Sequence, residues 1–281
     1  MGETAASAEW RQAGVWTNQD SVLFGVAFVC GRRRRLRWIG FADFEFELDS
    51  DTISITAEPG VSEAAIFDEF DRTPRAIVFQ ARGYESLHSS AAVIDHRAAV
   101  FCGLTHSGKS TLALALNRRG FSQLADDHVV FRVEDQRPIV LPLAYGRNIR
   151  PATRHHFNLS ESSAHAESNV APLHPIDIGA LFSLEQDASH PRPFTITPVP
   201  AHEAFTRVLP HAYCFDSDDA SESRRLTDAY LALVAHAPFF SVIYRPDFSA
   251  LDALCDAVVR TIRGAHSAPV VEPDHGAPSI R

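Results

Sequence analysis

The stretch AAVFCGLTHSGKSTLALALNRRG, residues 98–120, decides the expected fold. Small and apolar residues lead into Gly103 in the manner of a buried strand. Lys109–Arg119 is rich in strong helix formers, and Gly120 follows it as a helix-ending residue. Gly103 and Gly108–Ser110 satisfy the pattern G-x-x-x-x-G-K-[ST]. The order strand, glycine loop, helix predicts a phosphate-binding loop, because loop N–H groups and the positive end of a helix hold phosphate anions.

The expected nucleotide-binding residues are those of the loop and the first helical turn: Gly103, Leu104, Thr105, His106, Ser107, Gly108, Lys109, Ser110 and Thr111. In such a loop the lysine reaches the outer phosphates, and the hydroxyl of Ser110 binds Mg²⁺. ATP and Mg²⁺ are therefore the expected cofactors. Of the 26 basic residues Lys109 alone is lysine, so the chain uses a compact, flexible ammonium only here.

The histidine inside the loop is unexpected, because a loop that closes on phosphate favours small residues. Two interpretations of His106 are open. It contacts the phosphates as a titratable group, or it is a tolerated substitution that points to solvent. We favour the second, since histidine accepts a left-handed backbone better than β-branched residues do.

Two adjacent carboxylates follow the loop helix in LADDHVVF, residues 124–131. Phosphoryl transfer needs a carboxylate that accepts a proton and a group that anchors the metal. Asp126 and Asp127 are predicted at the start of a strand beside the loop strand. Strand alternation points them to opposite faces, so that one faces Mg²⁺ and the other the acceptor, and Asp126 is the candidate metal ligand. An acidic strand end on the surface is the alternative.

Composition excludes several classes of protein. The net charge of -9 argues against a general nucleic-acid binder. The basic run RRRRLR, residues 32–37, is expected in a solvated hairpin or edge strand. No window is apolar for the 18 to 20 residues, roughly, that a membrane span needs, so we expect a cytoplasmic protein without membrane contact. The sequence leaves a homo-oligomer open.

Hydrophobic patterning divides the chain into a β-rich N-terminal subdomain at 1–80, a domain with the phosphate-binding loop at 81–264 and a disordered tail at 265–281. Alternating strands are expected across 21–58, followed by a helix and then a strand at 75–81. Two strands around DHR at 95–97 are expected to form a hairpin or to lie side by side. Two helices close the domain, with Leu251, Leu254, Val258 and Ile262 on one face of the last.

Residues 87–131 resemble the catalytic domain of HPr kinase/phosphorylase, and more closely its truncated HPr-kinase-like relatives. The matching features are His88 before the loop, the GKST helix that ends in Arg-Gly, and the pair Asp126 and Asp127. The resemblance implies a mixed α/β P-loop fold of the HPr kinase and phosphoenolpyruvate carboxykinase type. It also implies His88 near the γ-phosphate, and Asp127 as the general base with Asp126 as the alternate. Read locally, His88 is more typical of a hydrogen-bonded core histidine.

The resemblance has limits. The region LPLAYGRNIRPATRHHF, residues 141–157, lacks the acid of the family's signature, so phosphorylase activity is not expected. Arg147, Arg150 and Arg154 can instead clamp phosphate or pair with surface acids. The N-terminal subdomain is unlike the family's, which favours enzymes such as lasso-peptide kinases. The leading hypothesis is an ATP-dependent serine kinase of a protein or peptide; the alternatives are a small-molecule kinase or carboxykinase-like enzyme and a non-catalytic nucleotide sensor.

Overall fold

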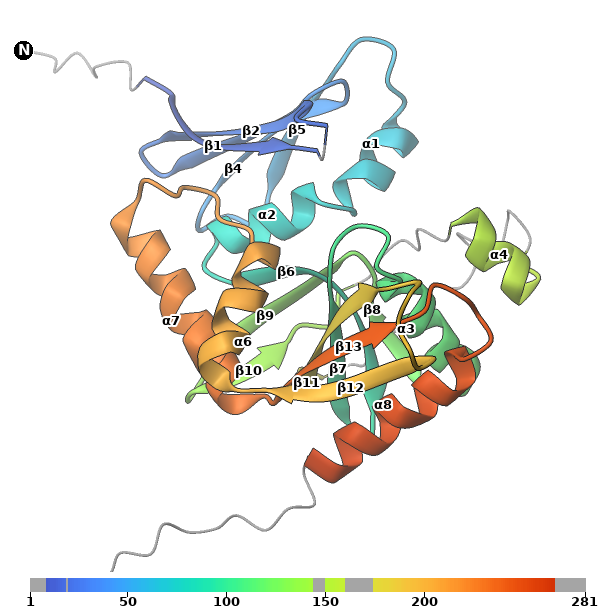
Figure 1. The fold of residues 1–281 in the computed structure, drawn as a ribbon. Coiled ribbons are helices and arrows are strands. Elements are labelled where there is room, and N and C mark those ends of the chain that lie inside the picture. The colour runs from blue at the N-terminus through green and yellow to red at the C-terminus, as the bar shows by residue number, and fades with distance from the viewer. Residues whose placement is uncertain (1–8, 19, 144–149, 160–173, 266–281) are drawn as a thin grey trace, which may run out of the picture.

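The structure is a computed structural model that describes residues 9–18, 20–143, 150–159 and 174–265. It is a mixed α/β protein with an N-terminal sheet unit and a larger unit (Figure 1). The tail predicted to be disordered lies outside the described residues, except that Ala265 ends the last helix. None of the helices in the described part of the chain combines the length and the apolar character that a membrane span requires.

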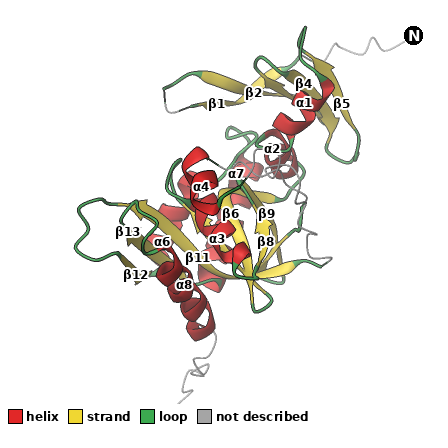
Figure 2. Ribbon diagram, turned by 90° about the vertical axis from the view of Figure 1, so that its right-hand side faces the viewer, coloured by secondary structure: helices red, strands yellow, loops and turns green. Residues whose placement is uncertain are grey.

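The N-terminal unit is a five-stranded antiparallel sheet backed by two helices. In chain order its elements are β1 (Arg11–Thr17), β2 (Leu23–Cys30), β3 (Arg33–Trp38), β4 (Ala42–Glu47), β5 (Ile53–Ala57), α1 (Glu63–Phe70) and α2 (Pro74–Ala81). One sheet face packs on the helices around Leu36, Phe44, Ile66 and Ile77, and Phe215 of the larger unit joins this core. Figure 2 shows α2 between the two units.

Strands β2 to β5 confirm the predicted alternation, whereas β1 forms from a segment without a predicted structure. The strand predicted at 75–81 is wrong, because this segment is helix α2. Its signal was Pro74 at the first helical position, where a missing N–H costs nothing. Apolar residues at helical spacing, Ile77 and Ala81, then face the sheet core.

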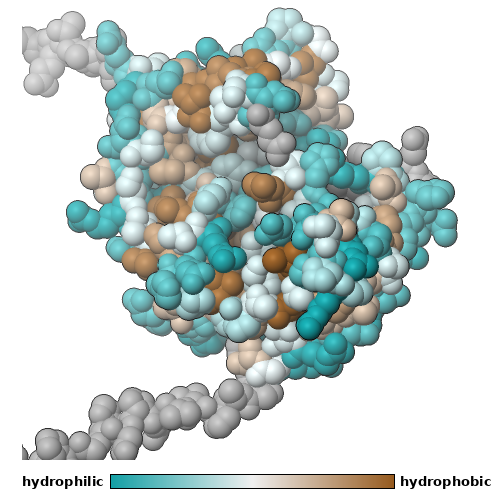
Figure 3. All heavy atoms as spheres, in the orientation of Figure 1, coloured by the Kyte–Doolittle hydropathy of each residue, from teal (hydrophilic) through white to brown (hydrophobic). Residues whose placement is uncertain are grey.

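The basic run lies on a hairpin, as expected, but its strand is not at an edge. β3 is the middle strand of the sheet, between β2 and β4. Acids of β4 neutralise its arginines across the strands: Glu45 pairs with Arg33 and Arg35, and Asp43 pairs with Arg37, at 2.7 to 2.9 Å. Paired charges let an arginine-rich strand occupy the centre. Figure 3 shows hydrophobic side chains gathered at the top of this unit.

The larger unit contains an eight-stranded sheet in the described residues, with strand order β10-β9-β6-β7-β11-β13-β12 and β8 beside β6. The strands are β6 (Glu85–Ile94), β7 (Arg97–Cys102), β8 (Ser122–Ala125), β9 (His128–Glu134), β10 (Arg137–Val140), β11 (Ile176–Gln186), β12 (Phe194–Val199) and β13 (Phe239–Tyr244). Strands β6 and β7 form the hairpin, with Asp95 and His96 both left-handed at its turn.

Helices cover both faces of this sheet, so it forms the middle of three layers. One face is covered by α6 (Ala201–Val208) and α7 (Ala220–His236), and the other by α3 (Lys109–Arg118) and α8 (Leu251–Ala265). The larger unit also contains α4 (Pro151–Phe157) and a 3₁₀ turn, η1 (Leu209–His211). Central strand β7 alternates between two cores. Val100 points to the core under α6 and α7, and Phe101 points to the core under α3 and α8. Leu254, Val258 and Ile262 of α8 are buried in the latter, as predicted.

Candidate functional site

The candidate site lies where three parallel strands end. Strands β7, β11 and β13 run in parallel, with Cys102 beside Ser183 and Gln186 beside Tyr244. Their carboxyl ends therefore meet at one edge of the sheet, and the glycine loop, residues 103–108, leaves β7 there. In α/β sheets ligands bind outside the carboxyl ends of the strands. A cavity of about 500 Å³ opens at this edge.

Two positions of the loop leave no room for a Cβ in the present arrangement. Gly108 has φ +86, and a Cβ there would lie 2.1 Å from the hydroxyl of Tyr244. A Cβ on Gly103 would lie 2.5 Å from Oγ of Ser107 and 2.6 Å from the carbonyl oxygen of Leu184. Real Cβ contacts are longer than this, so a side chain at either position would force a neighbouring atom to move. Such a close-packed loop presents its backbone, which is what binding a phosphate group needs.

Two residues that the sequence analysis missed brace this loop. The hydroxyl of Tyr244 donates to the carbonyl of Ser107 at 2.6 Å, and Nε2 of Gln186 donates to the same hydroxyl at 2.9 Å. Both residues line the cavity. Neither residue was placed on a predicted strand, and their one signal, the apolar run that precedes each of them, does not distinguish them from other residues.

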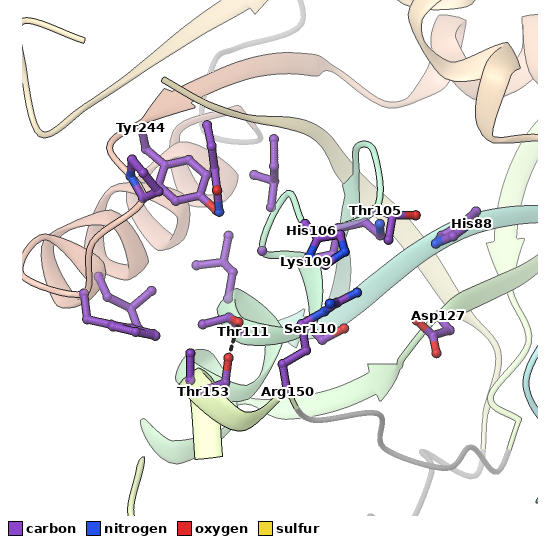
Figure 4. A pocket seen from close by; sticks show the side chains of 18 of the residues that line it. His88, Thr105, His106, Lys109, Ser110, Thr111, Asp127, Arg150, Thr153 and Tyr244 are labelled. Atoms are coloured by element: carbon purple, nitrogen blue, oxygen red, sulfur yellow. Dashed lines mark hydrogen bonds between the residues drawn. The ribbon is translucent and has the colours of Figure 1, made fainter. Parts of the chain in front are cut away.

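Lys109 begins α3 and lies in the cavity wall, 6 % exposed. Its ammonium donates to the carbonyl oxygens of Gly103 and Leu104, at 2.9 and 3.2 Å. Burial lowers the pKa of Lys109, while the carboxylate of Asp127 acts in the opposite direction. The only lysine is thus folded onto the loop that precedes it, within reach of the space that the loop encloses (Figure 4).

Most of the predicted nucleotide-binding residues line the cavity: Thr105, His106, Gly108, Lys109, Ser110 and Thr111. Leu104 is instead 76 % exposed. His106 is left-handed, with φ +74, as expected for a position that favours glycine. Its exposed ring borders the cavity, and this position is compatible with both interpretations of its role.

The structure separates the two aspartates. They lie in a break between β8 and β9 rather than at the start of a strand, so that part of the prediction is wrong. Asp127 is left-handed, with φ +66, and its backbone carbonyl still accepts from the amide of Ser89 at 3.0 Å. A single left-handed residue redirects the chain locally, as in a β-bulge. Asp127 consequently lines the cavity, whereas Asp126 is not among the lining residues.

Asp126 is 5 % exposed, and its Oδ1 accepts a hydrogen bond from the hydroxyl of Ser90 at 2.9 Å. The metal role predicted for Asp126 stays a prediction. Burial raises the pKa of Asp127, although Lys109, Arg72 and Arg150 each favour its ionised form. A carboxylate with a raised pKa beside cations has the properties of a proton acceptor.

His88 reaches the cavity because β6 extends past the end of β7: Ser89 pairs with Cys102, and residues 85–88 pair with β9. Burial, helped by Lys109 and His211, lowers the pKa of His88 to about 4. Its ring is therefore neutral at pH 7. It lies 5.7 Å from the ring of His128, and its Nδ1 is 3.5 Å from the hydroxyl of Tyr213.

Helix α4 borders the cavity opposite β6. The hydroxyls of Thr153 and Thr111 form a hydrogen bond at 2.8 Å that ties α4 to α3. Of the three arginines predicted as phosphate clamps, Arg150 lines the cavity. Arg154 follows within α4 and does not line it, and Arg147 lies outside the described residues.

The N-terminal unit also contributes to this cavity, which no sequence signal had indicated. Glu69, Arg72 and Thr73, at the corner between α1 and α2, are lining residues. Across the cavity, beyond the loop, the lining is more apolar, with Tyr244, Phe248 and Leu251 among its residues.

The residues that line the cavity fit Mg²⁺ that is bound together with a nucleotide better than they fit a metal ion held by protein side chains alone. The described residues contain no cluster of three histidine, cysteine or acidic side chains that could hold a metal ion by themselves. Mg²⁺ in phosphoryl-transfer sites uses one or two protein ligands, and phosphate oxygens and water complete its shell. The hydroxyl of Ser110, at the start of α3 and in the cavity wall, can be such a ligand.

No protein-family model and no curated protein matches the sequence. Among solved structures, the chain is similar to the HPr(Ser) kinase/phosphatase from Coxiella burnetii, with a TM-score of 0.35 and 16 % sequence identity. The match covers 63 % of this chain and 95 % of that chain. A likeness this distant establishes no activity, substrate or cofactor for the chain.

Proposed function

We propose that the protein is an ATP-dependent kinase that phosphorylates a serine hydroxyl of a protein or peptide. One observation carries the proposal: the glycine loop with Lys109 and the carboxylate of Asp127 border the same cavity, at the carboxyl ends of parallel strands. Its volume of about 500 Å³ suits a small-molecule ligand. The serine acceptor rests on the resemblance of residues 87–131 to HPr kinase.

In this proposal the nucleotide lies along the loop. Backbone amides and the start of α3 hold its phosphates, and its nucleoside occupies the more apolar end beside Tyr244 and Phe248. Lys109 exchanges its two carbonyl partners for phosphate oxygens and stabilises the charge of the transferred group. Mg²⁺, bound by the Ser110 hydroxyl together with phosphate oxygens, supplies further charge neutralisation.

Asp127 accepts the proton of the serine hydroxyl as the oxygen bonds to the terminal phosphorus and ADP departs. Its raised pKa makes it a stronger base than an ordinary aspartate. His88 is neutral at pH 7, so it acts as a hydrogen-bonding group toward the phosphate rather than as a cation. Asp126 supports this side of the site through its bond to Ser90.

Nucleotide binding can be tested through the single lysine. An acyl-phosphate derivative of ATP acylates a lysine amine that lies next to the bound phosphates. We expect this reagent to modify Lys109 and free ATP to prevent the modification, with peptide mapping as the measurement. The chain has no second lysine to compete, so only the N-terminal amine needs to be distinguished. Labelling that ATP does not suppress would exclude the proposed nucleotide position.

The reaction is tested with Mg²⁺, ATP and two acceptor panels, serine-containing peptides and small hydroxylated metabolites. We expect phosphoserine in a peptide, with transfer lost in Lys109→Met, which keeps the aliphatic stem and removes the ammonium. Transfer only to metabolites would indicate a small-molecule kinase. ATP binding without transfer to either panel would indicate a nucleotide sensor.

A further inference from the structure

The cavity has two ends with different chemistry on either side of the glycine loop. Figure 4 shows Thr111, Thr153 and Tyr244 on one side of Lys109, and His88 and Asp127 on the other. With the nucleoside at the Tyr244 end, the acceptor must approach from the Asp127 end, because the attacking oxygen lies opposite the leaving oxygen across the transferred phosphorus and within reach of the base. The residues around Asp127 therefore face the acceptor.

At that end part of the wall belongs to the N-terminal unit. Its corner between α1 and α2 places Glu69, Arg72 and Thr73 in the cavity. The corner is fixed from both sides. Nε1 of Trp38 donates to Oε1 of Glu69 at 2.9 Å, and Oγ1 of Thr73 lies 3.2 Å from Nε2 of His128 in β9. The corner thus bridges the N-terminal sheet and the strand that follows Asp127.

Arg72 is the group at this corner best placed to bind a ligand. Its side chain is 47 % exposed, and its ion pair with Glu69 is long, with 3.9 Å between Nη1 and Oε2. Glu69 is 22 % exposed and already accepts a hydrogen bond from Trp38. Arg72 also favours the ionised form of Asp127, so its positive charge acts on the proposed base. A guanidinium with a weak internal partner can form a two-pronged contact with a carboxylate or phosphate.

We propose, resting on the proposed kinase function, that the α1–α2 corner is the acceptor wall and that Arg72 binds an anionic group of the acceptor peptide next to its serine. The substrate class is then a serine peptide with an acidic residue close to the phosphorylated position. The N-terminal unit is accordingly a substrate-binding element of the kinase, not an appended sheet.

The experiment compares initial rates on a positional-scanning library of serine peptides for the full-length wild type, Arg72→Ala and Arg72→Glu. The wild type should prefer an acidic residue at one position beside the serine. Arg72→Ala should lose about tenfold in kcat/KM on the acidic peptide relative to its Gln or Asn counterpart. Arg72→Glu should turn the preference toward Lys or Arg at the same position.

Arg32→Ala is the matched control, because it removes one positive charge from the same unit outside the cavity. Its partner Asp49 is exposed, so it should keep the wild-type preference. ATP affinity, measured separately, should stay within about threefold of wild type in Arg72→Ala.

The two possible failures are distinguishable. Transfer to peptides with no acidic preference, or with one that Arg72→Ala and Arg72→Glu leave unchanged, would overturn the role of Arg72 while the kinase stands. Absence of transfer to every peptide by the wild type would overturn the kinase function and this inference with it.

Discussion

Gly108 offers a quantitative test of how the loop is held, because the chain provides its own control. Gly108 and Gly120 have almost the same left-handed backbone, φ +86 and +92. A Cβ at Gly120 would meet no heavy atom within 4 Å, whereas at Gly108 it would lie 2.1 Å from the hydroxyl of Tyr244. Alanine at the two positions therefore shares the conformational cost and differs in the contact with Tyr244.

The magnitudes follow from these contacts. Gly120→Ala should lower the free energy of unfolding by about 1 to 2 kcal/mol, the cost of a left-handed alanine. Gly108→Ala carries the same cost and also displaces the Tyr244 hydroxyl from Ser107 and Gln186. At about 1 kcal/mol for each hydrogen bond, the total becomes about 3 to 4 kcal/mol.

Urea unfolding of both variants, of Tyr244→Phe and of the double variant Gly108→Ala with Tyr244→Phe provides the measurement. Removing the hydroxyl first eliminates the shortest contact, so the two substitutions should be less harmful together than their sum by about 2 kcal/mol. The ring carbon that carries the hydroxyl would remain 3.3 Å away. Equal losses for Gly108→Ala and Gly120→Ala, or strict additivity with Tyr244→Phe, would refute the argument that Tyr244 clamps the loop.

Two further predictions concern titratable groups. Asp127→Asn should slow phosphoryl transfer by about 10² to 10⁴-fold and leave ATP affinity unchanged. It should also remove the acid limb of the pH–rate profile, along which the rate of the wild type rises with pH as Asp127 ionises. The control Asp126→Asn should keep this limb, and an Asp127→Asn enzyme as fast as wild type would contradict the assigned base. The pKa of His88 in the folded protein, about 4, lies below its value in the unfolded chain. Between pH 6.5 and 4 the unfolded chain therefore binds more protons than the folded protein, so this histidine lowers the free energy of unfolding as the pH falls through that window. As the pH falls from 6.5 to 4, the free energy of unfolding of His88→Gln, measured in urea, should therefore rise relative to that of wild type, by at most about 1.4 kcal/mol per pH unit. A difference between the two proteins that does not change with pH would contradict the buried neutral ring.

Local patterns in the sequence specified the elements that carry the loop. The apolar run of β7, the glycine loop and the helix formers of α3 are each encoded within a few residues, so the strand, loop and helix order could be predicted. The alternation of β2 to β5 and the buried face of α8 are local periodicities of the same kind. Where local signals conflicted, as in α2 with its β-branched residues after Pro74, the prediction failed.

The composition of the site depended on contacts between distant segments, which no local pattern records. Tyr244 braces Ser107 across 137 residues, and Thr73 meets His128 across 55. The left-handed turn that brings Asp127 to the cavity and leaves Asp126 buried against Ser90 exists only because β8 and β9 both pair with β6. Local sequence is enough to specify a glycine loop with a single lysine at its end. Tertiary packing sets which carboxylate faces that lysine, and it also makes the N-terminal unit one wall of the cavity. The physical reason is that side-chain direction and proximity depend on the pairing of strands that lie far apart in the chain.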